Sequence, residues 1–148
     1  MTDSNHKGKE LFDSGLYCAE SVLKVIADEE NIVSPLIPGI ATGFCSGMSR
    51  TCNMCGALTG GMLALNVVLG RSSSDEPVET NYEAVQSLID GFKGEFGSIN
   101  CKDLLDCDLG TNEGQKVFSE NNLHLKCREY TGKATELTRE IISNLKKP

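Results

Sequence analysis

The chain has 148 residues, 39% of them hydrophobic and 24% charged, and a formal net charge of -7. This length fits a single domain, residues 1–148, with a core large enough to be stable without crosslinks. The acidic excess argues against nucleic acid as a partner and against binding to an anionic membrane surface. The first fifteen residues lack the apolar segment of a signal peptide, so we expect a cytoplasmic protein.

Most of the sequence has apolar residues three or four positions apart, a spacing typical of helices. The clearest example runs through residues 79–96 and ends at Gly97. Residues 51–70 form the most apolar stretch, but Asn66 and several glycines interrupt it, which favours a buried helix without membrane insertion. In chain order, we expect helices over residues 17–29, 34–48, 53–70 and 79–96, short helices after Asn100 and Asn112, and a long helix from Cys127.

Capping signals set the expected boundaries of these helices. Ser34 is a suitable N-cap with Pro35 at the first helical position, and Asn53 and Asn112 are further candidate caps. No run of β-branched residues alternates with polar ones, so no strand is expected. The predicted fold is all-α, an irregular helical bundle of four to five main helices plus short helices. Residues 1–8 are expected to form a flexible tail.

The seven cysteines are the unusual part of the composition. Cytoplasmic thiols stay reduced, so a disulfide framework is not expected. Cys18, Cys55, Cys101 and Cys127 each fall at or near the start of a predicted helix. A helix N-terminus carries a partial positive charge that lowers the pKa of a nearby thiol. These placements predict a cluster of thiolates contributed by separate helices.

Four thiolates can bind zinc, a [2Fe–2S] cluster or a [4Fe–4S] cluster, and the spacing of these cysteines does not choose among them. Cys52 and Cys55 form the one local pair, which can chelate a metal or close a redox disulfide. The chain has no C-x-x-C-H motif, so covalent haem is not expected. We interpret His6 and His124 as solvated, although His124 is near enough to Cys127 to support a bound group.

A short motif connects these cysteines to a known family. Residues 55–60 read CGALTG, and the chain resembles the C_GCAxxG_C_C family, which has a C-G-A-x-x-G signature and four characteristic cysteines. The other three match Cys18 in LYCAESVL, Cys101 in FGSINCKDLL and Cys127 in KCREY. The resemblance extends from about residue 9 to residue 145. It implies a helical fold, a redox role and a site made by these four cysteines.

The resemblance also bears on the cofactor. Relatives of this domain occur joined to haem-bearing domains, where the cysteines suit an iron–sulfur cluster. This chain lacks haem-attachment motifs, so the resemblance implies at most the cluster or thiol portion. The chain departs from the family pattern by adding Cys45, Cys52 and Cys107, whose roles as ligands, resolving thiols or core residues stay open.

Three hypotheses follow. In the first, Cys18, Cys55, Cys101 and Cys127 bind an iron–sulfur cluster, specifically [2Fe–2S], and exchange electrons with an unknown redox partner protein. In the second, Cys55 is a reactive thiol that Cys52 or another cysteine resolves. In the third, the same four cysteines hold a structural zinc ion in an interaction protein. The sequence leaves open a homodimer that completes the site.

Overall fold

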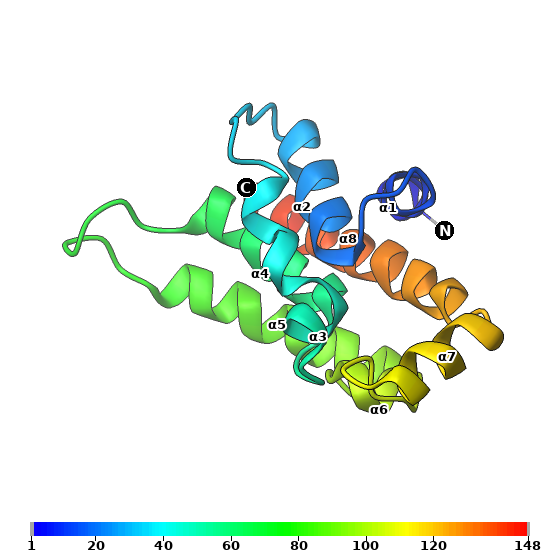
Figure 1. Cartoon of the computed structure of the whole chain (residues 1–148). Coiled ribbons are helices and arrows are strands. Elements are labelled where there is room, and N and C mark those ends of the chain that lie inside the picture. Colours follow the sequence, from blue (N-terminus) through cyan, green and yellow to red (C-terminus); the bar gives the residue numbers. More distant parts are fainter. Residues whose placement is uncertain (1, 148) are drawn as a thin grey trace.

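The computed structural model describes residues 2–147, and over this range the chain is helical with no strand, which confirms the predicted all-α class. Figure 1 shows an irregular bundle with a long loop between its fourth and fifth helices. The elements are α1 (Asp3–Asp13), α2 (Cys18–Glu29), the 3-10 helix η1 (Gly39–Phe44), α3 (Cys45–Arg50), α4 (Gly56–Leu69), α5 (Glu79–Phe96), α6 (Cys101–Leu105), α7 (Asn112–Glu120) and α8 (His124–Lys146).

The long helices with clear periodicity lie close to their predicted positions. α5 has the predicted bounds, and α2 begins one residue later than predicted. Cys55, not Asn53, is the N-cap of α4. Thr111, not Asn112, caps α7, because its hydroxyl oxygen accepts a hydrogen bond of 2.9 Å from the Gly114 N–H. The last helix begins at His124, so the predicted start at Cys127 was three residues late.

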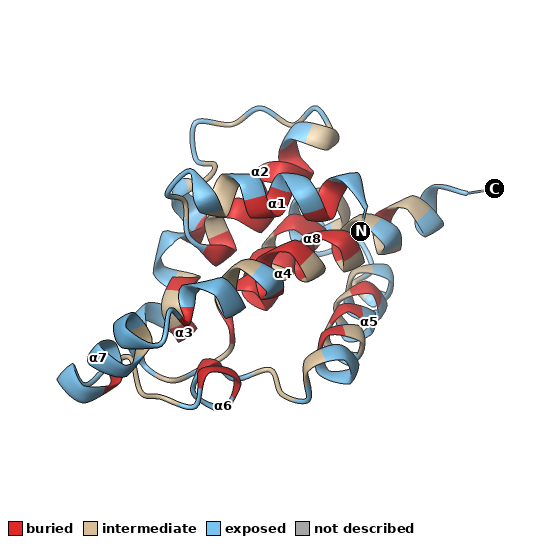
Figure 2. Cartoon of the chain, turned by 90° about the vertical axis from the view of Figure 1, so that its right-hand side faces the viewer, coloured by how far each residue is buried: buried red, intermediate tan, exposed pale blue. Residues whose placement is uncertain are grey.

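The helix α4 is the centre of the core, and it packs against α2, α5 and α8. Its glycines allow the neighbouring helices to approach closely. A side chain at Gly60 would meet the Ala19 carbonyl oxygen of α2 at 2.6 Å, and one at Gly61 would meet Leu88 of α5 and Thr138 of α8 at 2.7 Å. Figure 2 shows that the buried residues concentrate on α4 and on the faces of α2 and α8 that surround it.

The N-terminal segment differs from its prediction. Residues 3–8 were expected in a flexible tail, but they form the first turns of α1, which packs on α8. The Thr2 hydroxyl caps this helix by accepting from the Asn5 N–H, and Gly8 fits directly against Thr135. The prediction was wrong because the buried face of α1 is made of Ser4, Asn5 and other non-aliphatic residues, so it has no apolar period.

Residues 34–48 also differ from their prediction of one right-handed helix. They form a turn, the 3-10 helix η1, and then a left-handed turn in which Ser46, Gly47, Met48 and Ser49 have φ between 58° and 65°. Left-handed backbone costs about 1–2 kcal/mol for each residue with a side chain. Hydrogen bonds offset part of this cost, including 3.0 Å from the Asn53 N–H to the Gly47 carbonyl and 2.7 Å from the Ser49 hydroxyl to the Gly43 carbonyl.

The close contact at Gly60 gives a stability prediction. Gly60→Ala should lower the free energy of unfolding by about 1–3 kcal/mol, because the new methyl group would collide with the α2 backbone, which cannot rotate away. Gly94→Ala is the matched control, since Gly94 lies within α5 with nothing near the position of its side chain. It should raise stability by about 0.5–1 kcal/mol through helix propensity. Urea unfolding measures both, and equal effects would contradict the packing argument.

Candidate functional site

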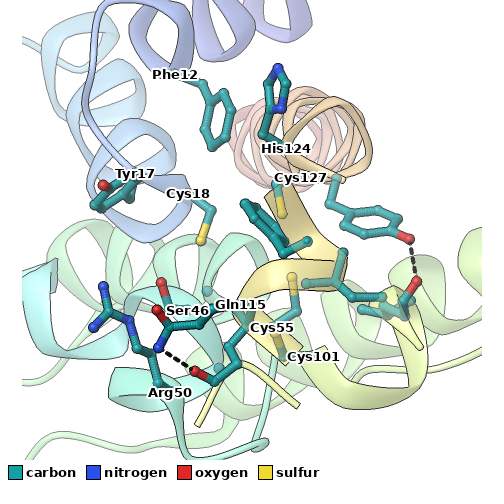
Figure 3. A pocket seen from close by; sticks show the side chains of 17 residues that line it. Phe12, Tyr17, Cys18, Ser46, Arg50, Cys55, Cys101, Gln115, His124 and Cys127 are labelled. Atoms are coloured by element: carbon teal, nitrogen blue, oxygen red, sulfur yellow. Dashed lines mark hydrogen bonds between the residues drawn. The ribbon is translucent and has the colours of Figure 1, made fainter. Parts of the chain in front are cut away.

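One cavity of about 230 Å³ brings together the four cysteines that the sequence analysis selected. Cys18, Cys55, Cys101 and Cys127 all line it, and they come from four different elements (Figure 3). The walls are otherwise largely apolar and include Phe12, Leu104, Leu105, Leu109, Phe118 and Tyr130. The fold therefore brings four cysteines from separate elements to one cavity.

Cys18 enters the cavity as the first residue of α2, and it is 8% exposed. Its sulfur lies against Gly56, where a side chain would come within 2.3 Å of the Cys18 Sγ. The glycine of the C-G-A-x-x-G motif therefore provides the space that lets this thiol reach the beginning of α4. A larger residue at position 56 would displace the sulfur or the Cys45 backbone on the other side.

Cys55 and Cys101 are joined by a short antiparallel bridge between Met54 and Asn100. The Cys55 N–H donates to the Ile99 carbonyl at 2.7 Å, and the Cys101 N–H donates to the Asn53 carbonyl at 2.8 Å. These two bonds hold the N-terminus of α4 beside the N-terminus of α6. Both thiols thereby reach the same cavity although they are far apart in sequence.

Gly47 gives Cys101 its position within this bridge. A side chain at Gly47 would meet the Cys101 Cβ at 2.6 Å, so the left-handed turn of α3 packs directly on this cysteine. The φ of Gly47 is 65°, a conformation that glycine adopts without strain. The turn thus serves as one wall of the cavity.

Cys127 lies in the first turn of α8 and faces the other thiols across the cavity (Figure 3). Its helix is tied to α6, because the Tyr130 hydroxyl donates a 3.0 Å hydrogen bond to the Leu104 carbonyl. The Tyr130 ring also packs on Phe96, with ring centroids 4.8 Å apart. These contacts hold one wall of the cavity against the core.

Burial dominates the acidity of three of these thiols. Desolvation raises the pKa of Cys55 to about 12, although the Ala57 and Leu58 N–H groups at the start of α4 act in the opposite direction. Burial likewise raises the pKa of Cys101 to about 11 and that of Cys127 to about 12. The prediction that helix N-termini would make these thiols acidic is therefore wrong, because desolvation of a buried thiolate exceeds the effect of the helix end.

The four thiols share a cavity without forming a single-ion site. Within residues 2–147, no group of three or more His, Cys, Asp or Glu side chains is arranged to hold a metal ion. Tetrahedral zinc needs four donors about 2.0–2.3 Å from one point.

The three additional cysteines lie outside the cavity lining. Cys45 is buried behind Cys18, whose thiol is the main cause of the raised pKa of Cys45. The Cys52 thiol donates a 2.8 Å hydrogen bond to the Asp108 carboxylate, which raises the pKa of Cys52. Cys107 is half-buried. The local Cys52 and Cys55 pair is thus divided, since only Cys55 reaches the cavity.

Sequence reasoning did not select two of the polar residues at the cavity, Arg50 and Gln115. Arg50, which is exposed on the left-handed turn, lines it together with Gln115, whose side-chain amide donates 3.0 Å to the Leu109 carbonyl. His124 is exposed and also lines the cavity, whereas His6 lies on an exposed position of α1. Arg50 had no recognisable signal in the sequence, because its place depends on the left-handed backbone.

The fold and the cavity define a class, a small all-α protein with a site lined by four buried or half-buried cysteines. None of the helices in residues 2–147 combines the length and apolar character that a membrane span requires. The family model described as "Putative redox-active protein (C_GCAxxG_C_C)" matches residues 16–141, and the chain belongs to this family. Searches of curated proteins and of solved structures gave no match.

Burial of the thiols gives a prediction for stability against pH. A thiol whose pKa is raised by folding binds its proton more tightly in the folded chain than in the unfolded chain. The stability that this difference gives the fold is complete below the ordinary pKa, and it is lost as pH rises from that value through the raised pKa. Starting from an ordinary value of 9.0, Cys55 titrates at about 12 and Cys101 at about 11. The free energy of unfolding should therefore fall above about pH 9, by about 1.4 kcal/mol per pH unit for each buried thiol.

Urea unfolding with a reductant and a chelator, from about pH 8 to about pH 10.5, measures this slope. Cys55→Ser and Cys101→Ser should each make the dependence shallower, since serine does not titrate in this range. The same slope in the wild type and in both variants would contradict the assignment to these thiols.

Proposed function

We propose that this chain is a small electron-transfer protein whose cavity binds an iron–sulfur cluster through Cys18, Cys55, Cys101 and Cys127. The observation that carries the proposal is the convergence of these four thiols on one largely apolar cavity of about 230 Å³. Four cysteine thiolates are the usual ligand set for such clusters, and the family is associated with redox activity. When bound, a cluster would supply one-electron transfer to a partner protein.

The redox character of the family favours a cluster over a structural zinc ion, because zinc itself has no redox chemistry. A cluster distributes its ligands over several iron atoms, so its thiolates can be further apart. Four thiolates serve [2Fe–2S] and [4Fe–4S] alike, and we take [2Fe–2S] as the specific proposal.

The chain's own residues would adapt the cavity to a negatively charged group. Four thiolates around iron leave net negative charge, which a nearby cation and helix N-termini stabilise. Arg50 supplies a cation at the cavity, and α4 begins there with the Ala57 and Leu58 N–H groups directed at the Cys55 sulfur. The apolar side chains of the lining lower the local dielectric around the thiols and so strengthen these electrostatic interactions.

A thiol–disulfide role for Cys55 and Cys52 has less support. The nucleophile in such exchange is the thiolate, and burial raises the pKa of Cys55 to about 12. Cys52 lies outside the cavity lining and donates its hydrogen bond to Asp108. These two observations favour the cluster proposal.

Metal analysis tests the proposal directly. We expect anaerobically purified or reconstituted protein to contain iron and acid-labile sulfide in equal amounts, with a visible absorption that dithionite bleaches. A [2Fe–2S] cluster gives two irons per chain and [4Fe–4S] gives four. Cys18→Ser, Cys55→Ser, Cys101→Ser and Cys127→Ser should each lose most of the iron, whereas Cys107→Ser, outside the cavity lining, is the matched control and should keep it.

Other outcomes would contradict the proposal. Tightly held zinc without sulfide would indicate a structural site, in which case chelation should unfold the chain. A protein that takes up neither iron nor zinc under reconstitution would exclude the cluster. Equal iron loss in Cys107→Ser and in the four cavity variants would show that the effect is not specific to the cavity.

Arg50 gives a second prediction for the same site. A reduced cluster carries one more negative charge than an oxidised one, so a nearby cation favours reduction. Arg50→Gln should therefore make the midpoint potential of the loaded protein more negative, without loss of iron. Arg71→Gln is the matched control, because Arg71 lies in the exposed loop after α4 and bonds to the Ser74 and Glu76 carbonyls. An equal shift in both variants would exclude a local effect of Arg50.

A further inference from the structure

Cys45 is one of the cysteines that the family signature does not include, and it lies directly beside Cys18. The neighbouring Cys18 thiol is the largest cause of the raised pKa of Cys45. The surroundings of Gly56 show independently that Cys18 and Cys45 are close to each other. A side chain at Gly56 would be 2.3 Å from the Cys18 Sγ and 3.1 Å from the Cys45 Cα. Both cysteines are buried, with 8% and 4% of their surface exposed.

The two thiols differ in their access to the cavity. Cys18 lines it, whereas Cys45 lies behind Cys18 and is absent from the lining. The Cys45 thiol is instead directed at the main chain, with its Sγ 3.7 Å from the Ala41 carbonyl oxygen. The N–H groups of Ala19 and Glu20, at the start of α2, also face the Cys45 sulfur and lower its pKa. A reagent in the cavity therefore reaches Cys18 first, and Cys45 is the neighbouring thiol.

The backbone around Cys45 is not fixed by a regular helix. Cys45 is extended, with φ -68° and ψ 158°, and it stands between η1 and the left-handed turn. A disulfide needs two Cα atoms about 4.4–6.8 Å apart and a defined torsion about the S–S bond. A residue at a junction of this kind can make the small adjustment that such a bond requires more easily than one inside a helix.

We propose that Cys18 and Cys45 form a disulfide when the chain meets a low-molecular-weight disulfide oxidant, and that this bond withdraws Cys18 from the cavity. The Cys18 sulfur first attacks the oxidant, forming a mixed disulfide and releasing one small thiol, which takes the Cys18 proton. Once Cys18 is in the mixed disulfide, its thiol no longer raises the pKa of Cys45, whereas the Ala19 and Glu20 N–H groups still lower it. The Cys45 sulfur then attacks the Cys18 sulfur and releases the second small thiol, which takes the Cys45 proton. The protein loses two electrons and two protons, and the oxidant gains both as it becomes two small thiols.

The functional consequence rests on the proposed function, but the bond itself does not. If the cavity binds a cluster, the disulfide leaves three of the four ligands, so oxidised protein cannot be loaded until it is reduced. In oxidising surroundings Cys45 would then prevent assembly of the cluster site, and in reducing surroundings it would allow it. Bound cluster would in turn protect Cys18 from the oxidant.

Peptide mapping tests the bond on the metal-free full chain. Trypsin cleaves after Lys9, Lys24 and Arg50, so Cys18 lies in peptide 10–24 and Cys45 in peptide 25–50, and neither peptide carries another cysteine. After treatment with hydroxyethyl disulfide and alkylation of the remaining thiols, we expect mass spectrometry to find these two peptides linked. The linked species should disappear on reduction.

Variants assign the roles of the two thiols. Cys45→Ser should abolish the link and leave Cys18 as the mixed disulfide with the reagent, since no neighbouring thiol then resolves it. Cys107→Ser is the matched control, a cysteine outside the cavity lining, and it should form the link as the wild type does. Circular dichroism of each variant shows whether it is folded. Oxidation that links other pairs in preference, or leaves Cys18 and Cys45 on separate peptides in the wild type, would overturn the proposal.

Failure of this inference is distinguishable from failure of the cluster proposal. The linked peptides are measured without any metal, and iron loading is measured without oxidant. A chain that loads iron but never links Cys18 to Cys45 overturns the disulfide alone. A chain that forms the link but takes up no iron overturns the cluster proposal and leaves the disulfide standing.

Discussion

The packing of α2 directly on the beginning of α4 is the contact on which the site depends. It exists because positions 56 and 60 carry no side chain. Gly60 lets the Ala19 backbone approach, and one helical turn earlier Gly56 accommodates the Cys18 sulfur. The spacing of the two glycines places both contacts on one face of α4. The same interface therefore supports the core and brings the first cysteine to the N-cap cysteine.

A second constraint brings Cys101 to the same place. The bridge between Met54 and Asn100 is short, but its two main-chain hydrogen bonds connect the caps of α4 and α6. The left-handed turn covers this bridge from one side, and Gly47 contacts Cys101. Strained backbone is often found at functional sites, where the surrounding contacts hold it in place. Here the strained segment begins directly after Cys45 and ends near Cys52, and it places Arg50 at the cavity.

Burial then determines what the cavity thiols can do. In the metal-free chain, Cys55, Cys101 and Cys127 are held as neutral thiols because a buried thiolate lacks solvation. Neutral thiols are poor nucleophiles, which makes them unreactive toward stray oxidants and electrophiles. A cationic group that entered the cavity would replace the missing solvation and displace the protons, so its affinity would rise with pH.

The sequence by itself determined the helical class and the bounds of α5, because these depend on apolar periodicity, and a local motif with its matching cysteines indicated the four that line one cavity. It could not determine that residues 3–8 are helical, since the packed face of α1 is polar and shows no hydrophobic period. Nor could it show the left-handed turn, whose cost is offset by hydrogen bonds to residues outside the turn. Only the tertiary structure decided that Cys52 faces Asp108 while Cys45 lies beside Cys18, because side-chain neighbours that are distant in sequence are set by helix packing. The same packing buries the cavity, and for that reason desolvation, which no local pattern encodes, prevails over the helix N-termini in setting the acidity of three of its thiols.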